Sequence, residues 1–130
     1  MEAISAAQMW TGRILSGIAV AFLVMDAVGK LMRVEPVVEG TVKLGYRADS
    51  VVTVGLLLHA VVVLYVVPRT SLLGAIYLAA YLGGAVATHY RVGSPLLSHV
   101  LFPVYVALLL WGGLALRTPR LVSLLTGVSS

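Results

Sequence analysis

Four long apolar segments dominate this sequence, and charged side chains hardly interrupt them. A helix crosses the hydrocarbon core of a bilayer, about 30 Å thick, with roughly 20 apolar residues, and the workable range is about 17 to 25. Each segment meets this requirement, so the pattern predicts four membrane-spanning helices. The segments cover residues 14–32, 51–67, 71–90 and 100–116.

The composition favours the same class of protein. The chain has 130 residues, of which 60% are hydrophobic and 11% are charged, and its mean hydropathy is +1.02. Most residues of such a small soluble domain lie near its surface, so a single core could not bury this much apolar surface. We therefore expect one integral membrane domain over residues 1–130, with the lipid bilayer as its first partner.

Two counts exclude classes of function. Without cysteine the chain can form no disulfide, thiolate zinc site, iron–sulfur cluster or dithiol redox relay. The formal net charge is +4, but the nine Lys and Arg residues are scattered singly and do not form a nucleic-acid-binding patch. They fit better as cations at the ends of membrane helices, so no nucleic-acid partner is expected.

The connections between the segments define the expected architecture. Only residues 68–70 separate the second segment from the third, which predicts a tight antiparallel helix pair. The long connection, residues 33–50, has Pro36 where a helix can start and Gly45 where it can stop, and so predicts a short interfacial helix. The expected fold is an all-α bundle of four transmembrane helices, with this short helix between the first and second spans.

An even number of spans places both termini on one side of the membrane. Most polar residues of the spans and of the third connection then gather toward the opposite side: Asp26, Lys30, His89, Arg91, Ser94, Ser98 and His99. Lys and Arg residues are divided four against five between the two sides, so their count does not orient the chain.

Of the residues in the first span, Asp26 costs the most free energy to place inside a membrane. A carboxylate at this depth must be protonated, hydrated or paired with a cation. Lys30 lies one helical turn further along the same face, and Arg91 is within reach if the first and third spans are neighbours. We predict a structural ion pair, with a proton-transferring or ligand-binding acid as the alternative.

The three histidines are expected to form hydrogen bonds. His59, near the middle of the second span, is expected to be neutral and bonded to a neighbouring helix. His89 and His99 flank the connection between the third and fourth spans and suit helix-end bonding, with Ser98 as a cap of the fourth span. A metal held by these two histidines and Asp26 is the less favoured alternative, because no compact His-x-x-x-His pair is present. No metal or cofactor is predicted.

Small residues recur at every fourth position of the third span. This spacing places them along one helix face and lets another helix backbone approach closely. We interpret them as helix-packing positions, since a cofactor-binding glycine motif would need a strand-to-helix turn. They are Ala75, Ala79, Gly83 and Ala87.

Several stretches also carry a resemblance over nearly the whole chain: "GRILSGIAVAFLVMDAVGKL", "EGTVKLGY" and "VLYVVPRTSLLGAIYLAAYLGGAVATHYRVGSPLLSHVLFPVYVALLLWGGL". In this order they resemble the DoxX-like family of small membrane proteins. The strongest parts are Asp26 with Lys30, "LYVVPRT", "GGAVATHYRVG" and "SHVLFP". The resemblance implies a compact four-helix protein of the bacterial inner membrane, with both termini in the cytoplasm.

The resemblance implies less about activity. The family is named after a subunit associated with a thiosulfate:quinone oxidoreductase, and animal relatives assist assembly of neurotransmitter receptors; neither function is transferred to this chain. Many relatives carry an acid in the middle of the second span, where this chain has Leu58 beside His59, and often an acid at the position of Ser94. The positions that carry over are Asp26, His89, Arg91 and His99.

The sequence leads to one expected function and two alternatives. It has no serine-nucleophile motif, phosphate loop or paired carboxylates. We therefore expect an accessory subunit or assembly factor without catalytic activity, acting as a homo-oligomer or with a membrane-protein partner. The first alternative binds or transports an amphiphile, such as a quinone, a sterol-like molecule or a lipid, in a one-sided polar pocket. The second is a quinone-linked oxidoreductase subunit that depends on an external cofactor or partner.

Overall fold

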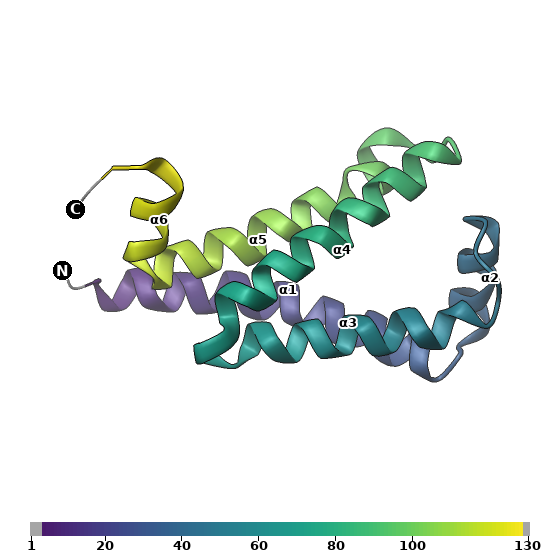
Figure 1. Ribbon diagram of the computed structural model, residues 1–130, viewed down its shortest axis with the longest axis horizontal. Helices are drawn as coiled ribbons and strands as arrows, with labels where there is room; N and C mark the ends of the chain where they lie inside the picture. The colour runs from purple at the N-terminus through teal and green to yellow at the C-terminus, as the bar shows by residue number, and fades with distance from the viewer. Residues whose placement is uncertain (1–3, 129–130) are drawn as a thin grey trace.

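The computed structural model describes residues 4–128, which form helices and connecting turns without a β-strand (Figure 1). Both ends of the chain lie at one end of the molecule, and α2 lies at the other. The long helices are α1 (Ala6–Leu31), α3 (Ser50–Val66), α4 (Ser71–Arg91) and α5 (Phe102–Arg117). The short ones are α2 (Glu35–Lys43) and α6 (Pro119–Thr126), with a 3-10 turn at Pro68–Thr70 and a π-helical turn at Leu96–Val100.

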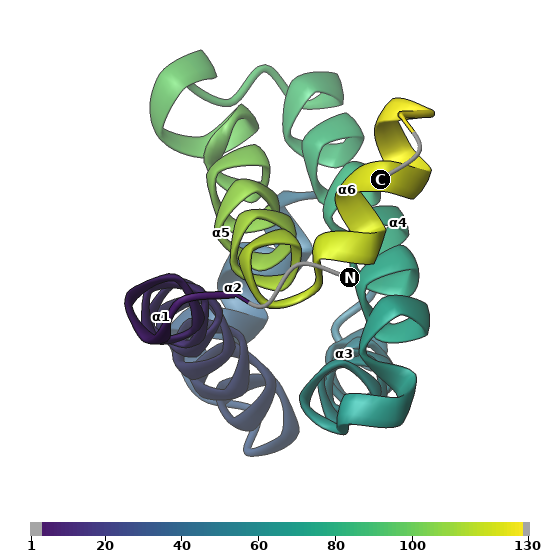
Figure 2. The same cartoon turned by 90° about the vertical axis from the view of Figure 1, so that its left-hand side faces the viewer.

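The four long helices form a ring of neighbours. Helix α1 packs against α3 and α5, and α4 packs against the same two helices, so α1 and α4 occupy opposite corners (Figure 2). The predicted all-α class and the antiparallel α3–α4 pair are confirmed. The condition under which Arg91 could reach Asp26, with the first and third spans as neighbours, is not met, because no contact joins α1 to α4 within residues 4–128.

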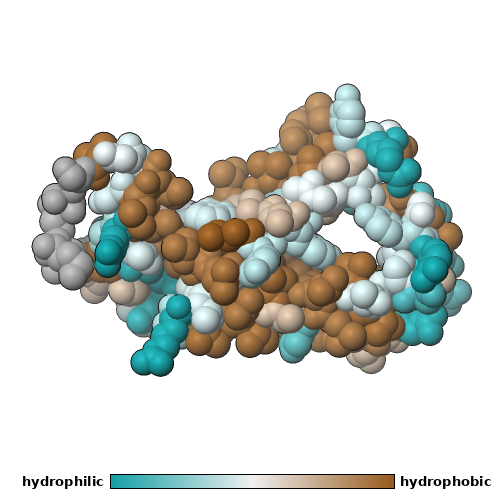
Figure 3. All heavy atoms as spheres, in the orientation of Figure 1, coloured by the Kyte–Doolittle hydropathy of each residue, from teal (hydrophilic) through white to brown (hydrophobic). Residues whose placement is uncertain are grey.

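The outer surface has the character of a membrane protein. Three helical stretches are long and apolar enough to cross a bilayer, namely Ala6–Leu31, Pro68–Arg91 and Leu96–Arg117, and α3 is a shorter apolar helix of 17 residues. Large apolar side chains such as Ile18, Leu57 and Leu108 are exposed along their sides. Hydrophobic residues cover the flanks of the bundle, and most hydrophilic residues lie at its ends (Figure 3).

Helices α1 and α5 make their closest approach near the termini. A Cβ atom added to Gly12 would lie 2.7 Å from the carbonyl oxygen of Gly113, and one added to Gly113 would lie 2.7 Å from the carbonyl oxygen of Gly12. Small residues at helix contacts are the usual means of close packing in lipid, where apolar side chains gain little by meeting one another. This crossing therefore requires glycine on both helices.

The close contact between α3 and α4 also depends on a glycine. A Cβ atom at Gly74 would lie 2.6 Å from Cα of Tyr65. Of the predicted packing positions on α4, Ala75 is fully buried, whereas Ala79, Gly83 and Ala87 are exposed and a Cβ at Gly83 would meet nothing within 4 Å. The inward face of α4 runs through Gly74, Ala75, Leu78 and Leu82, so three of the four predicted packing positions face outward and their role in packing stays a prediction.

The helix ends differ from the sequence prediction in three places. Helix α1 begins at Ala6 instead of residue 14, and the Ser5 hydroxyl accepts a hydrogen bond from the Gln8 N–H at 3.1 Å. The fourth predicted helix is preceded by the π-helical turn, so Ser98 lies inside that turn and does not cap α5. Helix α6 was not predicted. By contrast α2 lies where expected, and Gly45 after it adopts φ +94°, which a glycine accommodates without strain.

Replacing Gly113 by alanine should destabilise the bundle, because the new methyl group would collide with α1. Overpacking typically costs about 1–3 kcal/mol. The matched control is Gly112→Ala, where a Cβ meets nothing within 4 Å; it should leave stability unchanged or raise it by up to about 1 kcal/mol through lower chain entropy. The free energy of unfolding in detergent micelles, measured by denaturant titration, distinguishes the two variants. Equal effects of both substitutions would contradict the glycine crossing.

Candidate functional site

The bundle opens toward the end that carries α2. Helices α4 and α5 diverge from α1 and α3 in this direction (Figure 1). The space-filling view shows an opening between the two helix pairs, bounded by the segment around α2 at its outer end (Figure 3). Most of the site residues expected from the sequence lie on the elements that meet here.

An ion pair lies on α1 near the end of the bundle that carries α2. Lys30 Nζ lies 2.6 Å from an Asp26 carboxylate oxygen, and the two side chains are 14% and 29% exposed, respectively. Asp26 and Lys30 follow the buried residues Leu23 and Ala27 by three positions each, which places both on the inward side of α1, and Asp26 lies within electrostatic reach of the Tyr81 hydroxyl on α4. The carboxylate therefore faces the interior of the bundle. The predicted Asp26–Lys30 ion pair is confirmed.

Arg91 has a different partner from the one considered. Its guanidinium donates a hydrogen bond from Nη2 to the carbonyl oxygen of Leu44 at 2.7 Å. Gly45 lies directly beneath, since a Cβ there would be 2.8 Å from the same nitrogen. The alternative pair between Arg91 and Asp26 does not form, because α1 and α4 are not neighbours within residues 4–128. Arg91 instead attaches the loop after α2 to the end of α4.

A second hydrogen bond joins the same two elements. The Tyr46 hydroxyl lies 2.9 Å from Oγ1 of Thr88, and the Thr88 hydroxyl donates to the carbonyl oxygen of Gly84 at 2.8 Å. Because Thr88 has one hydroxyl hydrogen, Tyr46 is the donor in the first bond. The two contacts from Arg91 and Tyr46 close the outer end of the opening.

Tyr81 is a site residue that sequence reasoning missed. It is half-buried on α4, and its hydroxyl lies within electrostatic reach of Asp26 and Tyr46. Within residues 4–128 this hydroxyl makes no hydrogen bond, which leaves a polar group facing the interior. Its spacing from the buried residues Leu78 and Leu82 is the signal in the sequence that places it on the inward face.

The histidines near the opening bond to neighbouring serines. His89 Nδ1 lies 3.1 Å from Oγ of Ser94, and His99 Nδ1 lies 2.8 Å from Oγ of Ser98. The two rings meet edge to face with centroids 5.9 Å apart. Asp26 does not join them, and among the described residues no three His, Cys, Asp or Glu side chains converge as metal ligands would.

His59 lies outside this group. Its side chain is exposed on α3, and the predicted bond to a neighbouring helix does not occur in the described part of the chain. The inward face of α3 runs through Leu58, and the next residue of a helix points about 100° away. His59 therefore faces outward.

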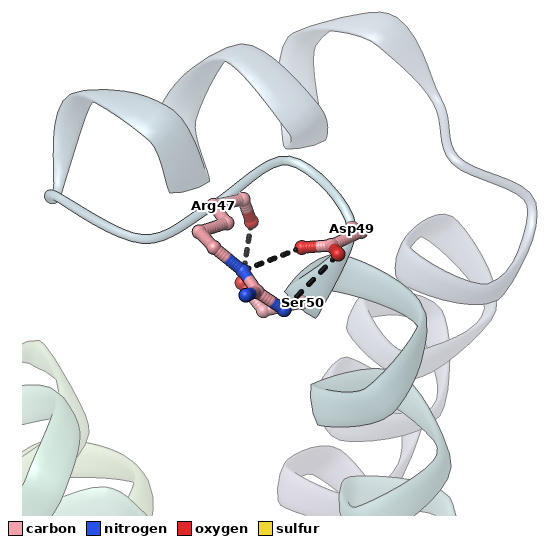
Figure 4. Close-up of polar contacts among 3 residues, drawn as sticks. All are labelled: Arg47, Asp49 and Ser50. Carbon is pink, nitrogen blue, oxygen red and sulfur yellow. Dashed lines mark hydrogen bonds and ion pairs between the residues drawn. The ribbon is translucent and has the colours of Figure 1, made fainter.

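An exposed ion pair lies where α3 begins. The Arg47 guanidinium donates hydrogen bonds to both carboxylate oxygens of Asp49, at 3.0 and 3.1 Å, and the Ser50 hydroxyl donates to the Arg47 carbonyl oxygen (Figure 4). The two charged side chains are 84% and 68% exposed. Such pairs contribute little to stability, because water screens them.

A buried polar network near the termini was also missed. The Tyr65 hydroxyl donates to the carbonyl oxygen of Leu110 at 2.6 Å and lies 2.7 Å from Oγ of Ser16. Arg117 donates from Nη2 to Ser16 Oγ at 2.9 Å and from Nε to the Gly113 carbonyl oxygen at 3.2 Å. These bonds join α1, α3 and α5. The sequence pattern identifies Arg117 only as a cation at a helix end.

The sequence pattern of the DoxX-like family matches residues 14–113, which include most of the four long helices. The chain belongs to the DoxX-like family. No curated protein and no solved structure matches it. The matched region of this DoxX-like chain contains the whole polar end, whereas α6 lies beyond it.

The chemistry available at the opening of the DoxX-like chain is that of hydrogen bonding. Asp26 offers acceptor oxygens, Lys30 offers N–H donors, and Tyr81 offers a hydroxyl. None of these is arranged beside a general base as an activated nucleophile would be. The arrangement suits the recognition of a polar head group more than bond-breaking chemistry.

The Asp26–Lys30 pair should contribute measurably to stability, because it is mostly shielded from water. Asp26→Asn should destabilise the protein by leaving Lys30 unpaired, and adding Lys30→Gln should restore part of the loss. A double-mutant cycle on unfolding in micelles should give a coupling of about 1–2 kcal/mol, below the cost of about 3–5 kcal/mol for breaking a fully buried pair. The exposed pair of Arg47 and Asp49 is the control and should give a coupling near zero. Similar couplings for the two pairs would contradict the assigned environment of Asp26.

Proposed function

We propose that this DoxX-like chain crosses the membrane four times and binds an amphiphilic small molecule in the opening between its helix pairs. The observation that supports it most is the partly exposed Asp26–Lys30 pair on the inward side of α1, in an apolar bundle whose helix pairs diverge toward α2. Ionised groups at membrane depth are costly and usually face a cavity or a partner. A ligand with a polar head group would offset this cost.

The four-span arrangement rests on the length and position of α3. Its 17 residues extend about 25 Å at 1.5 Å per residue, close to the thickness of a hydrocarbon core. Helix α3 packs against both α1 and α4. The connection from α1 enters α3 at one end, and the connection to α4 leaves it at the other. We place both termini on the cytoplasmic side of a bacterial inner membrane, in keeping with the family resemblance.

The shape of the site favours a particular kind of ligand. The donors and the acceptor are partly buried, whereas large apolar side chains such as Ile18, Leu57 and Leu108 are exposed on the outer surfaces of the long helices. A molecule with one hydrogen-bonding head group and an apolar body, such as a quinone or a sterol-like molecule, could enter sideways from the bilayer. Hydrogen bonds from Lys30 and Tyr81, and to Asp26, would hold the head group.

A second candidate is association with another membrane protein or with a second copy of the chain. The observation in its favour is the outward face of α4, where Ala79, Gly83 and Ala87 are exposed. Gly83 and Gly84 leave open space where a Cβ would be, so another helix could approach closely there. An accessory or assembly role would use this face and no catalytic group.

Binding should show as stabilisation that depends on Asp26. We expect decylubiquinone or cholesterol, added to the protein in mild detergent, to raise the midpoint of thermal unfolding, because a ligand that binds only the folded state stabilises it. Asp26→Asn should lose most of this shift, whereas the control Asp49→Asn, at an exposed carboxylate, should retain it. The double variant Asp26→Asn with Lys30→Gln keeps the comparison valid if the single variant folds poorly.

Two outcomes of this experiment would contradict amphiphile binding at Asp26. One is a wild-type protein that responds to neither probe, and the other is an unchanged response in the Asp26 variants. If the unresponsive protein is also an oligomer in native mass spectra after the detergent is removed, association explains the structure better than amphiphile binding.

The four-span topology can be tested with single cysteines, because the natural chain has none. Cysteines introduced at the exposed positions Ser5 and Thr126 should react with a membrane-impermeant maleimide from one side of the membrane, and one at Gly40 in α2 only from the other. Labelling in spheroplasts and in inverted vesicles separates the two sides. Labelling of Ser5 and Thr126 from opposite sides would mean that the number of spans is odd.

A further inference from the structure

The end of the molecule that carries the termini contains two adjoining clefts. Their volumes are about 330 and 270 Å³, and they share four lining residues: Pro68, Ser71, Leu114 and Thr118. The clefts thus lie where the turn before α4 meets the end of α5 and the start of α6. The opening described above lies at the far end of the bundle.

Arginine dominates the charge of this end. Arg69 and Arg120 line the larger cleft, and Arg13 and Arg117 line the smaller one. The acids of residues 4–128 are Asp26, Glu35, Glu39 and Asp49, all of which belong to the other end of the bundle. Between residues 4 and 128 no carboxylate lies within ion-pair distance of any of the four arginines.

Two of these arginines already have other contacts. Arg117 bonds to Ser16 and Gly113, and the Arg13 guanidinium carbon lies 5.0 Å from the centre of the Trp10 ring. Arg69 and Arg120 are exposed, and their side chains form no hydrogen bond within the described residues. Their guanidinium groups are thus available to a ligand in the larger cleft.

The larger cleft is apolar as well as cationic. Leu72, Leu114, Leu121 and Leu124 line it, and Leu124 is 67% exposed. Helix α6 contributes Leu121 and Leu124 on one wall, and α4 contributes Leu72 on another. The amino-terminal turn of α4 also begins here, so the positive end of its helix dipole faces the cleft. The cleft therefore combines anion-binding groups with a surface suited to an acyl chain.

We infer that this cleft binds an anionic phospholipid, with the phosphate head group between Arg69 and Arg120 and an acyl chain against Leu121 and Leu124. Guanidinium groups bind phosphate oxygens in a bidentate manner, and partly shielded sites strengthen such bonds. A zwitterionic lipid would bring an additional cation among arginines that have no acid within ion-pair distance among residues 4–128. This inference is independent of the proposed amphiphile site, since the two sites lie at opposite ends and share no residue.

The test compares lipids and charge-matched variants by native mass spectrometry in mild detergent. Phosphatidylglycerol and phosphatidylcholine with identical acyl chains are titrated into the wild-type protein, into Arg69→Gln with Arg120→Gln, and into Arg33→Gln with Lys43→Gln. Both double variants lose two positive charges, but the second pair lies on exposed positions around α2. Inorganic phosphate and glycerol 3-phosphate are added in a separate arm.

We expect wild-type protein to bind phosphatidylglycerol at least about tenfold more tightly than phosphatidylcholine, because each cation near an anionic lipid strengthens binding about fivefold. The Arg69 and Arg120 variant should lose about tenfold or more in affinity for phosphatidylglycerol, and the Arg33 and Lys43 variant should stay within about twofold of wild type. Millimolar phosphate or glycerol phosphate should not displace the lipid.

Three results would overturn the inference. Equal binding of the two lipids by the wild type would show that the cleft does not recognise the anionic head group. Equal losses in the two double variants would point to general charge attraction. Displacement of phosphatidylglycerol by either soluble phosphate would identify a free-anion site instead of a lipid site. The variant Leu124→Asn should keep the preference for phosphatidylglycerol over phosphatidylcholine, because it leaves the head-group contacts of Arg69 and Arg120 in place.

Discussion

The glycine crossing between α1 and α5 is the contact on which the rest of the bundle depends. In lipid the hydrophobic effect hardly drives helices together, so close backbone packing and buried hydrogen bonds must do so. Gly12 and Gly113 supply the packing, and Ser16, Tyr65 and Arg117 add hydrogen bonds at the same level. The network includes α3 through Tyr65, whose backbone packs closely on Gly74 of α4. All four long helices are thus fixed relative to one another near the termini.

Fixing one end allows the other end to open. Toward α2 the helix pairs diverge, and the loop after α2 reaches α4 through the bonds of Arg91 and Tyr46. The same division separates the charges. Arginines without nearby acids among residues 4–128 occupy the packed end, whereas cations and acids are mixed at the open end. The two ends therefore suit different ligands, a phosphate group at one and a neutral polar head at the other.

The four long helices and the pairing of α3 with α4 could be predicted from the sequence, but helix α6 and the other helix contacts could not. Apolar runs fixed the limits of α3 and α4 to within one residue, because lipid demands uninterrupted helices. The runs carry no information on which helix faces which, so Arg91 was considered as a partner of Asp26. Glycines posed the same problem: Gly83 and Gly74 both lie in α4, and only the packed structure shows that Gly74 meets a neighbour. The Asp26–Lys30 pair could be predicted because both residues lie on one helix, four residues apart.

The energetics of the two ends differ in a way that bears on ligand entry. Separating α1 from α5 would expose tightly packed backbone and break several buried hydrogen bonds at once. At the open end, the described side-chain contacts between α4 and the loop after α2 are the hydrogen bonds of Arg91 and Tyr46, each worth about 0.5–1.5 kcal/mol net, or somewhat more where a charged group donates. Releasing both would cost only a few kcal/mol, a cost that thermal fluctuation meets often on the microsecond-to-millisecond timescale of helix motions. Widening at the α2 end, with the glycine crossing intact, is therefore the cheapest way for the bundle to admit a molecule from the bilayer.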